Sequence, residues 1–157
     1  MLDIGSRLAI EDLFARYAHC IDDDRLEEWP ALFTEDALYQ VISAENYERG
    51  LPIGLIHADN RGMLEDRVTA LREANIYERQ RYRHMLSALL VEGWDGTEAR
   101  LRSAYTVTRI MQDGATMLFS SGRYLDRVRF TREGPRFSQR IVVYDSRRVD
   151  TLLAIPL

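Results

Sequence analysis

Residues 57–84 read HADNRGMLEDRVTALREANIYERQRYRH, and this stretch decides the fold because its hydrophobic period changes partway along. Its first half predicts an amphipathic helix that Asp59 or Asn60 can cap. The apolar stripe of that helix is Leu64, Val68 and Leu71. From Tyr82 onward apolar and polar residues alternate with a period of two, which is typical of a strand. The chain therefore changes here from a helical half to a β-rich half.

Upstream of this stretch, apolar residues at helical spacing predict a first helix with Ser6 as its N-cap and the acidic run 22–24 at its end. That helix carries Ile10, Leu13, Phe14, Tyr17, Ala18 and Ile21. A short helix should follow, with Pro30 near its first turn or at a kink. Its apolar residues are Leu26, Trp29, Leu32 and Phe33. Residues 38–42 and 53–56 predict short strands, and residues 46–52 predict a loop between them.

Downstream, three turn signals separate β-rich runs: Asp95-Gly96, Asp113-Gly114 and Gly134-Pro135. They predict four consecutive antiparallel strands at residues 83–92, 98–111, 115–131 and 136–145. Strands this long must bend, and residues 120–122 offer a site for a β-bulge. Helices followed by a long curved antiparallel sheet predict an α+β fold, with the helices packed on one sheet face. We expect one domain, residues 1–157.

Composition excludes several classes of protein. The 157 residues carry a formal net charge of −4 without a separate basic block, which disfavours a nucleic-acid partner. No apolar run approaches the roughly 20 residues of a membrane span, and the N-terminus does not resemble a secretory signal. Cys20 is the only cysteine, so an internal disulfide is impossible and a reducing bacterial cytoplasm fits best.

The chain contains no lysine, and all 21 of its Lys and Arg positions are arginine. A Schiff base and a P-loop lysine are therefore excluded. Arginine pairs bidentately with carboxylates and stacks on aromatic rings, which suits subunit interfaces. The codon bias of a GC-rich bacterial genome is the simpler explanation, and the two are compatible.

Redox iron cannot be held by this chain alone in the usual ways. A Rieske cluster needs two cysteines and two histidines, and the single cysteine excludes it. A mononuclear iron site needs two histidines and a carboxylate. His19, His57 and His84 satisfy the count, but none is near another in sequence. We therefore expect neither cofactor nor metal in this chain.

The sequence resembles the small (β) subunits of aromatic-ring-hydroxylating dioxygenases, and most of all those of terephthalate dioxygenases. The resemblance lies in residues 57–84, in the segments 109–111 (RIM) and 121–126 (SGRYLD), and in the tail 150–157 (DTLLAIPL). It implies the cone-shaped fold of the nuclear-transport-factor-2 (NTF2) superfamily. It also implies a structural, non-catalytic subunit in a hexamer of three large and three small subunits, in which the small subunits trimerise.

The same resemblance implies where the chemistry takes place. The large subunit would carry the Rieske [2Fe–2S] cluster and the mononuclear Fe(II). The reaction implied is ring cis-dihydroxylation with dioxygen and electrons from NAD(P)H through a reductase. An aromatic carboxylate is the implied substrate, with terephthalate favoured. This chain would contribute to the enzyme without an active site of its own.

An alternative interpretation is a free-standing cavity enzyme, a dehydratase or isomerase. In dehydratase relatives of this fold an Asp at a place similar to Asp22 works with cavity histidines and tyrosines. Asp22, Tyr17, Tyr39 and His84 could form such an acid–base site. The strand 98–111 has no histidine, however, which departs from the dehydratase pattern. The structural interpretation, in which the Asp residues cap helices and His84 is anchored by backbone or carboxylate bonds, is favoured. A cavity-bearing binding protein is a third possibility.

Candidate subunit contacts lie at two places. In an extended backbone Arg79, Arg81 and Arg83 share one face and could bind carboxylates of a neighbouring subunit. Pairing within the chain, with Glu73, Glu78 or the acidic run 22–24, is equally compatible with the sequence. Tyr77 and Tyr82 are interface anchors or simply sheet residues. The apolar tail, residues 152–157, must fold against the core or a partner, so Leu157 is also a contact candidate.

Overall fold

The computed structural model describes residues 1–74, 79–145 and 153–157; Tyr77 and Glu78 lie outside these ranges. Helix α1 and two short 3-10 helices come first: α1 (Ile4–Asp22), η1 (Leu26–Glu28) and η2 (Pro30–Leu32). Next come β1 (Phe33–Ser43), α2 (Ala44–Glu48), β2 (Ile56–Ala58) and α3 (Arg61–Ala74). The long strands are β3 (Gln80–Trp94), β4 (Glu98–Met111), β5 (Thr116–Thr131) and β6 (Gly134–Tyr144).

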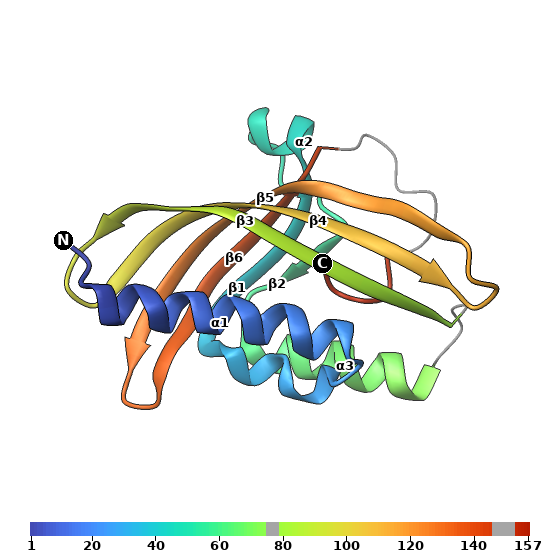
Figure 1. Cartoon of the computed structure of the whole chain (residues 1–157), viewed down its shortest axis with the longest axis horizontal. Coiled ribbons are helices and arrows are strands. Elements are labelled where there is room, and N and C mark those ends of the chain that lie inside the picture. The colour runs from blue at the N-terminus through green and yellow to red at the C-terminus, as the bar shows by residue number, and fades with distance from the viewer. Residues whose placement is uncertain (75–78, 146–152) are drawn as a thin grey trace.

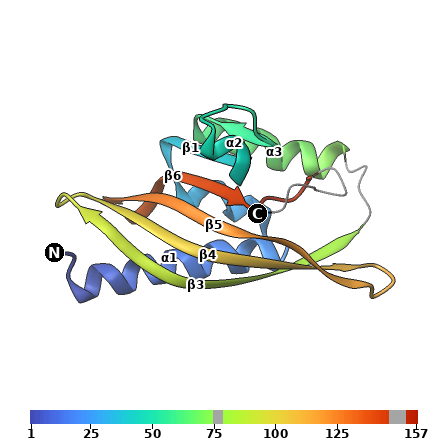
Figure 2. The same cartoon turned by 90° about the horizontal axis from the view of Figure 1, so that it is seen from above.

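The six strands form one curved sheet in the order β2-β1-β6-β5-β4-β3, and α1 and α3 lie on one side of it (Figure 1; Figure 2). The predicted α+β architecture is confirmed, as are the four consecutive antiparallel strands β3 to β6. One expectation was incomplete. Strand β1 pairs with β6 in parallel, so the sheet is mixed rather than wholly antiparallel.

The predicted cap of α1 was wrong. Asp3, not Ser6, is the N-cap, and its carboxylate accepts a hydrogen bond from the Ser6 backbone N–H at 3.0 Å and another from the Ser6 hydroxyl at 2.7 Å. The helix therefore begins at Ile4, before the first residue of the apolar stripe. For α3 the alternative Asn60 is confirmed, because its side-chain oxygen accepts from the Met63 N–H at 2.9 Å.

The short elements around β1 also differ from expectation. The predicted helix at 26–33 is split into two 3-10 turns, η1 and η2, with Pro30 opening the second, and Phe33 already belongs to β1. The predicted loop at 46–52 contains part of α2, capped by Ser43. The predicted strand at 53–56 is displaced to β2. Gly54 passes so close to β1 that a Cβ there would lie 2.5 Å from the Val41 backbone oxygen.

A bulge bends β5 as expected, one residue earlier than predicted. Val107 pairs with Ser120 and Thr108 pairs with Leu118, so Phe119 is the extra residue. Gly122, three residues after the bulge, pairs with Tyr144 of β6. A Cβ at this position would lie 2.0 Å from the Val143 backbone oxygen, so only glycine lets the two strands approach this closely.

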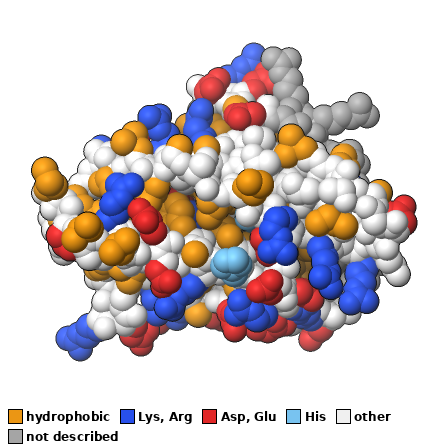
Figure 3. Space-filling model, viewed as in Figure 1, with side chains coloured by type: hydrophobic (Ala, Val, Ile, Leu, Met, Phe, Trp, Pro, Cys, Tyr) orange, Lys and Arg blue, Asp and Glu red, His pale blue; other side chains and the backbone are white. Residues whose placement is uncertain are grey.

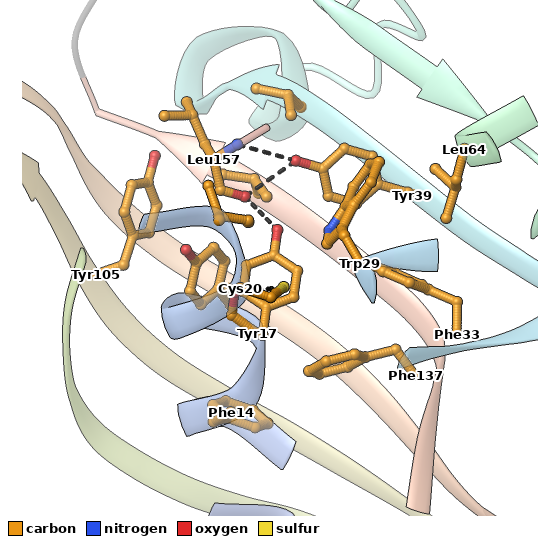
Figure 4. Close-up of a cluster of buried hydrophobic side chains, with 14 of the residues drawn as sticks. Phe14, Tyr17, Cys20, Trp29, Phe33, Tyr39, Leu64, Tyr105, Phe137 and Leu157 are labelled. Atoms are coloured by element: carbon orange, nitrogen blue, oxygen red, sulfur yellow. Dashed lines mark hydrogen bonds between the residues drawn. The ribbon is translucent and has the colours of Figure 1, made fainter. Parts of the chain in front are cut away.

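The core fills the space between the helices and the concave face of the sheet, and aromatic side chains dominate it (Figure 4). Trp29 packs edge-on against Phe33 and Tyr39, at centroid distances of 5.6 Å and 5.1 Å. Leu64 and Val68 of α3 close this side of the core, which confirms the predicted inner stripe of that helix.

Candidate functional site

Asp22 and His84 are brought together at the end of α1. Nδ1 of His84 lies 2.6 Å from Oδ1 of Asp22, and the His84 backbone N–H donates to Oδ2 at 2.9 Å. Both side chains are almost inaccessible, at 2% and 0% exposure. The carboxylate thus holds the Nδ1–H tautomer of the ring and ties the last turn of α1 to the edge strand β3.

Tyr17 and Tyr39 lie deeper in the interior, and both already have a hydrogen-bond partner. Their hydroxyls donate to the backbone oxygen of Leu157, the Tyr39 bond measuring 3.0 Å, and the Leu157 N–H donates to the Tyr39 oxygen at 3.2 Å (Figure 4). Burial raises the pKa of both phenols well above the usual value, so they remain protonated donors. The Tyr17 ring meets the His84 ring edge-on, with centroids 6.3 Å apart.

The tail of the chain occupies this interior. Residues 153–157 are buried, and Nη2 of Arg67 donates to the Leu153 backbone oxygen at 3.0 Å. The sequence predicted that the tail packs either against the core or against a partner. The described residues of the tail pack against the core of this chain. Leu157 is 1% exposed, so its side chain lies inside this chain and not on a surface that a partner could reach. In the alternative acid–base interpretation, a substrate would have to take the place of Leu157 between the two tyrosines.

A buried ion pair that the sequence analysis missed lies beside this interior. Arg140 of β6 donates two hydrogen bonds, each of 2.8 Å, to the carboxylate of Asp126 on β5, and both side chains are 0% exposed. The two residues stand directly opposite each other in the strand register. Burial alone would lower the pKa of Arg140, but Asp126 raises it above its usual value, so the arginine stays charged.

Aromatic rings enclose the Arg140 guanidinium, which lies 3.9 Å from the ring centroid of Tyr124 and 4.2 Å from that of Tyr17. Such contacts add cation–π attraction to the ion pair. The sequence did contain a signal. Asp126 falls in the inward-facing series between Tyr124 and Val128, where a charge needs a buried partner.

The three predicted contact arginines are exposed, and Arg81 and Arg83 lie on the same side of β3. Arg83 approaches the Asp22 carboxylate at 3.9 Å. Arg79 and Arg81 have no acidic partner among the residues that the structure describes. Of the two alternatives for Tyr82, the structure supports a sheet residue: it is 3% exposed and packs on Phe119 at 5.4 Å, on the opposite face.

Metal-binding side chains are dispersed. Within residues 1–74, 79–145 and 153–157, no three or more His, Cys, Asp or Glu side chains gather as metal ligands would. His19 and His57 lie on exposed positions of α1 and β2. Cys20 is buried, its thiol donates to the Tyr17 backbone oxygen at 3.3 Å, and burial raises its pKa to about 12. The described residues therefore do not fit an iron site, and the single cysteine does not fit a Rieske cluster. None of the described helices has the length and hydropathy to cross a membrane.

Comparison with known proteins adds three similarities over nearly the whole chain. The SnoaL-like domain family matches residues 3–141. The chain is 46% identical to a beta subunit of the terminal oxygenase component of terephthalate 1,2-dioxygenase from a Comamonas species, over 91% of this chain and 93% of that protein. It is 44% identical to the anthranilate 1,2-dioxygenase small subunit of Burkholderia cepacia, over 99% and 96%.

A solved structure agrees with these sequence matches. It is a protein from Novosphingobium aromaticivorans assigned as the beta subunit of an aromatic-ring-hydroxylating dioxygenase. It superposes with a TM-score of 0.87 and 41% identity, covering 95% of each chain. The fold and the sequence therefore point to the same group of proteins.

Proposed function

The chain belongs to the SnoaL-like family, among the small subunits of aromatic-ring-hydroxylating dioxygenases, and from this premise we propose that it is a structural subunit with no active site of its own. It contributes to the enzyme as a component of a multisubunit oxygenase. The large subunit carries the Rieske cluster and the mononuclear iron and performs the ring cis-dihydroxylation, with electrons arriving from NAD(P)H through a reductase. The observation that carries this proposal is the 46% identity across nine-tenths of both chains.

The geometry of the interior supports a structural role. The four residues of the alternative acid–base site are engaged in holding the fold: Asp22 with His84, and Tyr17 and Tyr39 with Leu157. An acid–base site requires groups that can reach a substrate. Between Tyr17 and Tyr39 the tail stands where that substrate would bind.

The substrate that we propose for the complete enzyme is an aromatic carboxylate. The names of both similar relatives specify a ring acid, terephthalate in one and anthranilate in the other. Terephthalate is favoured because that relative is the more similar of the two, at 46% against 44% identity. The difference is small, and substrate choice resides in the large subunit.

We assign the exposed arginine face, made of Arg79, Arg81 and Arg83, to contact with the large subunit in an assembly of three large and three small chains. Arginine pairs bidentately with carboxylates, and Arg79 and Arg81 have no acidic partner in the described part of the chain. Tyr82 and Leu157, which face inward, are left out of this surface.

Co-expression tests the proposal. The chain is produced with a Rieske-type large subunit encoded beside it, and the pair is purified through a tag on the small subunit. A stable hetero-oligomer should form, with iron and sulfide bound in proportion to the large subunit. Mass measurement by light scattering should give equal numbers of the two chains. Iron retained by the isolated small chain, or turnover of a small substrate by that chain alone, would refute the proposal.

A further inference from the structure

A groove of about 480 Å³ separates α1 from the edge strand β3. Space remains there because both facing elements carry small side chains, Ala15 and Ala18 on the helix and Ser87 and Ala88 on the strand. Figure 3 shows this face of the molecule, on which hydrophobic side chains gather between charged ones. The volume falls within the roughly 300–1,000 Å³ that is usual for small-molecule sites.

The wall of the groove on β3 is a strained bulge. Ala88 has a φ of 55°, in the left-handed region that side chains other than glycine rarely adopt. The register of β3 against β4 shifts between Ser87 and Leu90, so Ala88 belongs to an extra stretch of edge strand beside the groove. Such strain persists only where the surroundings impose it, and it is concentrated at ligand and active sites.

The floor of the groove contains a buried polar group without a partner. Ser103 lies on β4 opposite the bulge, in the inward-facing series with Leu101 and Tyr105, so its side chain points toward α1. It is 3% exposed, and its hydroxyl has no hydrogen-bond partner among the described residues. A buried hydroxyl normally has one, which leaves Ser103 able to bind a polar group of a ligand.

Charge is already neutralised around this floor. Arg7 spans the groove, with Nε 3.1 Å from the Glu11 carboxylate and Nη2 donating to the Leu89 backbone oxygen at 3.2 Å. Asp22, at the far end, is bound to His84. Two further charged or polar residues of the lining, His19 and Arg83, are exposed, and Arg83 lies 3.9 Å from the Asp22 carboxylate. The lining also includes the apolar residues Phe14, Leu86 and Leu89. A charged group buried beside Ser103, among these apolar side chains, would therefore lose its hydration without a compensating bond.

We propose that the α1–β3 groove binds a small uncharged aromatic molecule that carries a hydroxyl group. The ring packs against Phe14, Leu86 and Leu89, and the hydroxyl forms a hydrogen bond with Oγ of Ser103. This site is separate from the interior filled by the tail, and it does not depend on the proposed function.

Phenol and toluene form a matched pair of probes, because they have nearly the same shape and only phenol can form the hydrogen bond. Titrations of the ¹⁵N-labelled full chain are followed by NMR at the amides of residues 15, 89 and 103. Phenol should bind with a Kd of about 1 mM, within the range for so small a ligand. Toluene should bind about threefold to tenfold more weakly, the value of one hydrogen bond.

Ser103→Ala isolates the hydrogen bond. Because its hydroxyl has no partner in the described chain, the substitution should not destabilise the fold, while phenol should lose its advantage and bind no more tightly than toluene. If phenol and toluene bind the unmodified chain equally well, or if Ser103→Ala still binds phenol more tightly than toluene, the assignment of Ser103 is overturned.

Ala15→Trp tests the location, since the indole would fill the groove, and phenol binding should be lost. Its control is Arg16→Trp, the next residue, which is exposed and outside the groove lining and should bind phenol normally. Ser87→Phe, on the opposite wall, replaces Ala15→Trp if that variant does not fold. Unchanged phenol binding in the blocked variants overturns the proposal. So does the absence of amide shifts in the unmodified chain at about tenfold the expected Kd.

Discussion

Arginine side chains in the interior of the molecule and on its edge strand β3 differ in burial and in ion pairing. In the interior, Arg140 is completely buried, paired bidentately with Asp126 and surrounded by aromatic rings. On β3, Arg81 is exposed and has no acidic partner within the described residues. A buried charge that loses its partner destabilises the fold, whereas an exposed one is free to bind another chain. The difference separates residues that maintain this subunit from residues that can join it to others.

The strongest test of this contrast is Arg140→Met. It leaves the Asp126 carboxylate buried without its counter-charge, and we expect a loss of about 3–5 kcal/mol in the free energy of unfolding. Urea denaturation followed by tryptophan fluorescence measures it. The double variant Arg140→Met with Asp126→Leu should recover most of that stability. A single variant as stable as the parent chain would show that the pair does not support the fold.

The second test separates structure from catalysis at the Asp22–His84 pair. Asp22→Ala leaves the Nδ1–H and the backbone N–H of His84 without an acceptor, so we expect a loss of about 1.5–3 kcal/mol in the free energy of unfolding. His84→Ala, made separately, should behave similarly. In both, loss of dioxygenase activity should follow loss of assembly, measured by size-exclusion chromatography. A fully assembled but inactive variant would restore the acid–base interpretation.

The third test uses pH. The phenols of Tyr17, Tyr39 and Tyr124 titrate near pH 10 when the chain is unfolded, and burial raises their pKa values in the folded state. Above pH 10 the unfolded chain therefore binds fewer protons, so stability is full below pH 10 and falls as pH rises. As the phenol of the unfolded chain ionises, the slope from each tyrosine approaches about 1.4 kcal/mol per pH unit. Tyr39→Phe should reduce the slope measured by denaturation between pH 10 and 11.

The fourth test weakens the attachment of the tail. Tyr39→Phe removes the hydroxyl that bonds to Leu157, and we expect a loss of about 0.5–1.5 kcal/mol near neutral pH. Tyr105→Phe is a matched control, since its hydroxyl bonds to Ser120 at 2.9 Å and not to the tail. Hydrogen exchange at residues 153–157 should accelerate in Tyr39→Phe alone. Equal exchange in both variants would contradict the assigned role of Tyr39.

The smallest effect on the isolated chain is expected at the arginine face. Arg81→Glu should leave the melting temperature unchanged, because its side chain contacts no acidic group in the described residues. Assembly with the large subunit should weaken several-fold at low salt, and the difference should shrink as salt screens the charge. Arg132→Glu, at the exposed β5–β6 turn, is the control and should assemble normally. Identical assembly of both variants would remove Arg81 from the interface.

Long periodic segments of this fold could be predicted from the sequence, and short ones could not. The stripe of Leu64 and Val68 and the four long strands follow from periodicity and turn residues alone. The 3-10 turn at Pro30 and the strand β2 depend on contacts with β1, and Gly54 shows how close those contacts are. Local sequence patterns do not predict such contacts.

The site shows the same division. The apolar sequence of the tail predicted that it would be buried. Its hydrogen bonds to Tyr17 and Tyr39, however, span sequence separations of 140 and 118 residues, which no spacing rule predicts. The Asp126–Arg140 pair required the register of β5 against β6. Residue types alone gave Asp22 and His84 as candidates for one site, whereas the structure shows that neither side chain is accessible.

The parallel pairing of β1 with β6 has a consequence for synthesis on the ribosome. Phe33 is opposite Phe137 in that ladder, so β1 must wait for about 100 further residues, roughly 5–20 s at ordinary rates of translation. Throughout that interval the edge of the first strand that will pair with the sixth strand has no partner strand. The pairing of β1 with β6 is therefore a late, long-range event in folding. We expect chaperones that bind nascent chains to help this protein most before its sixth strand has been synthesised.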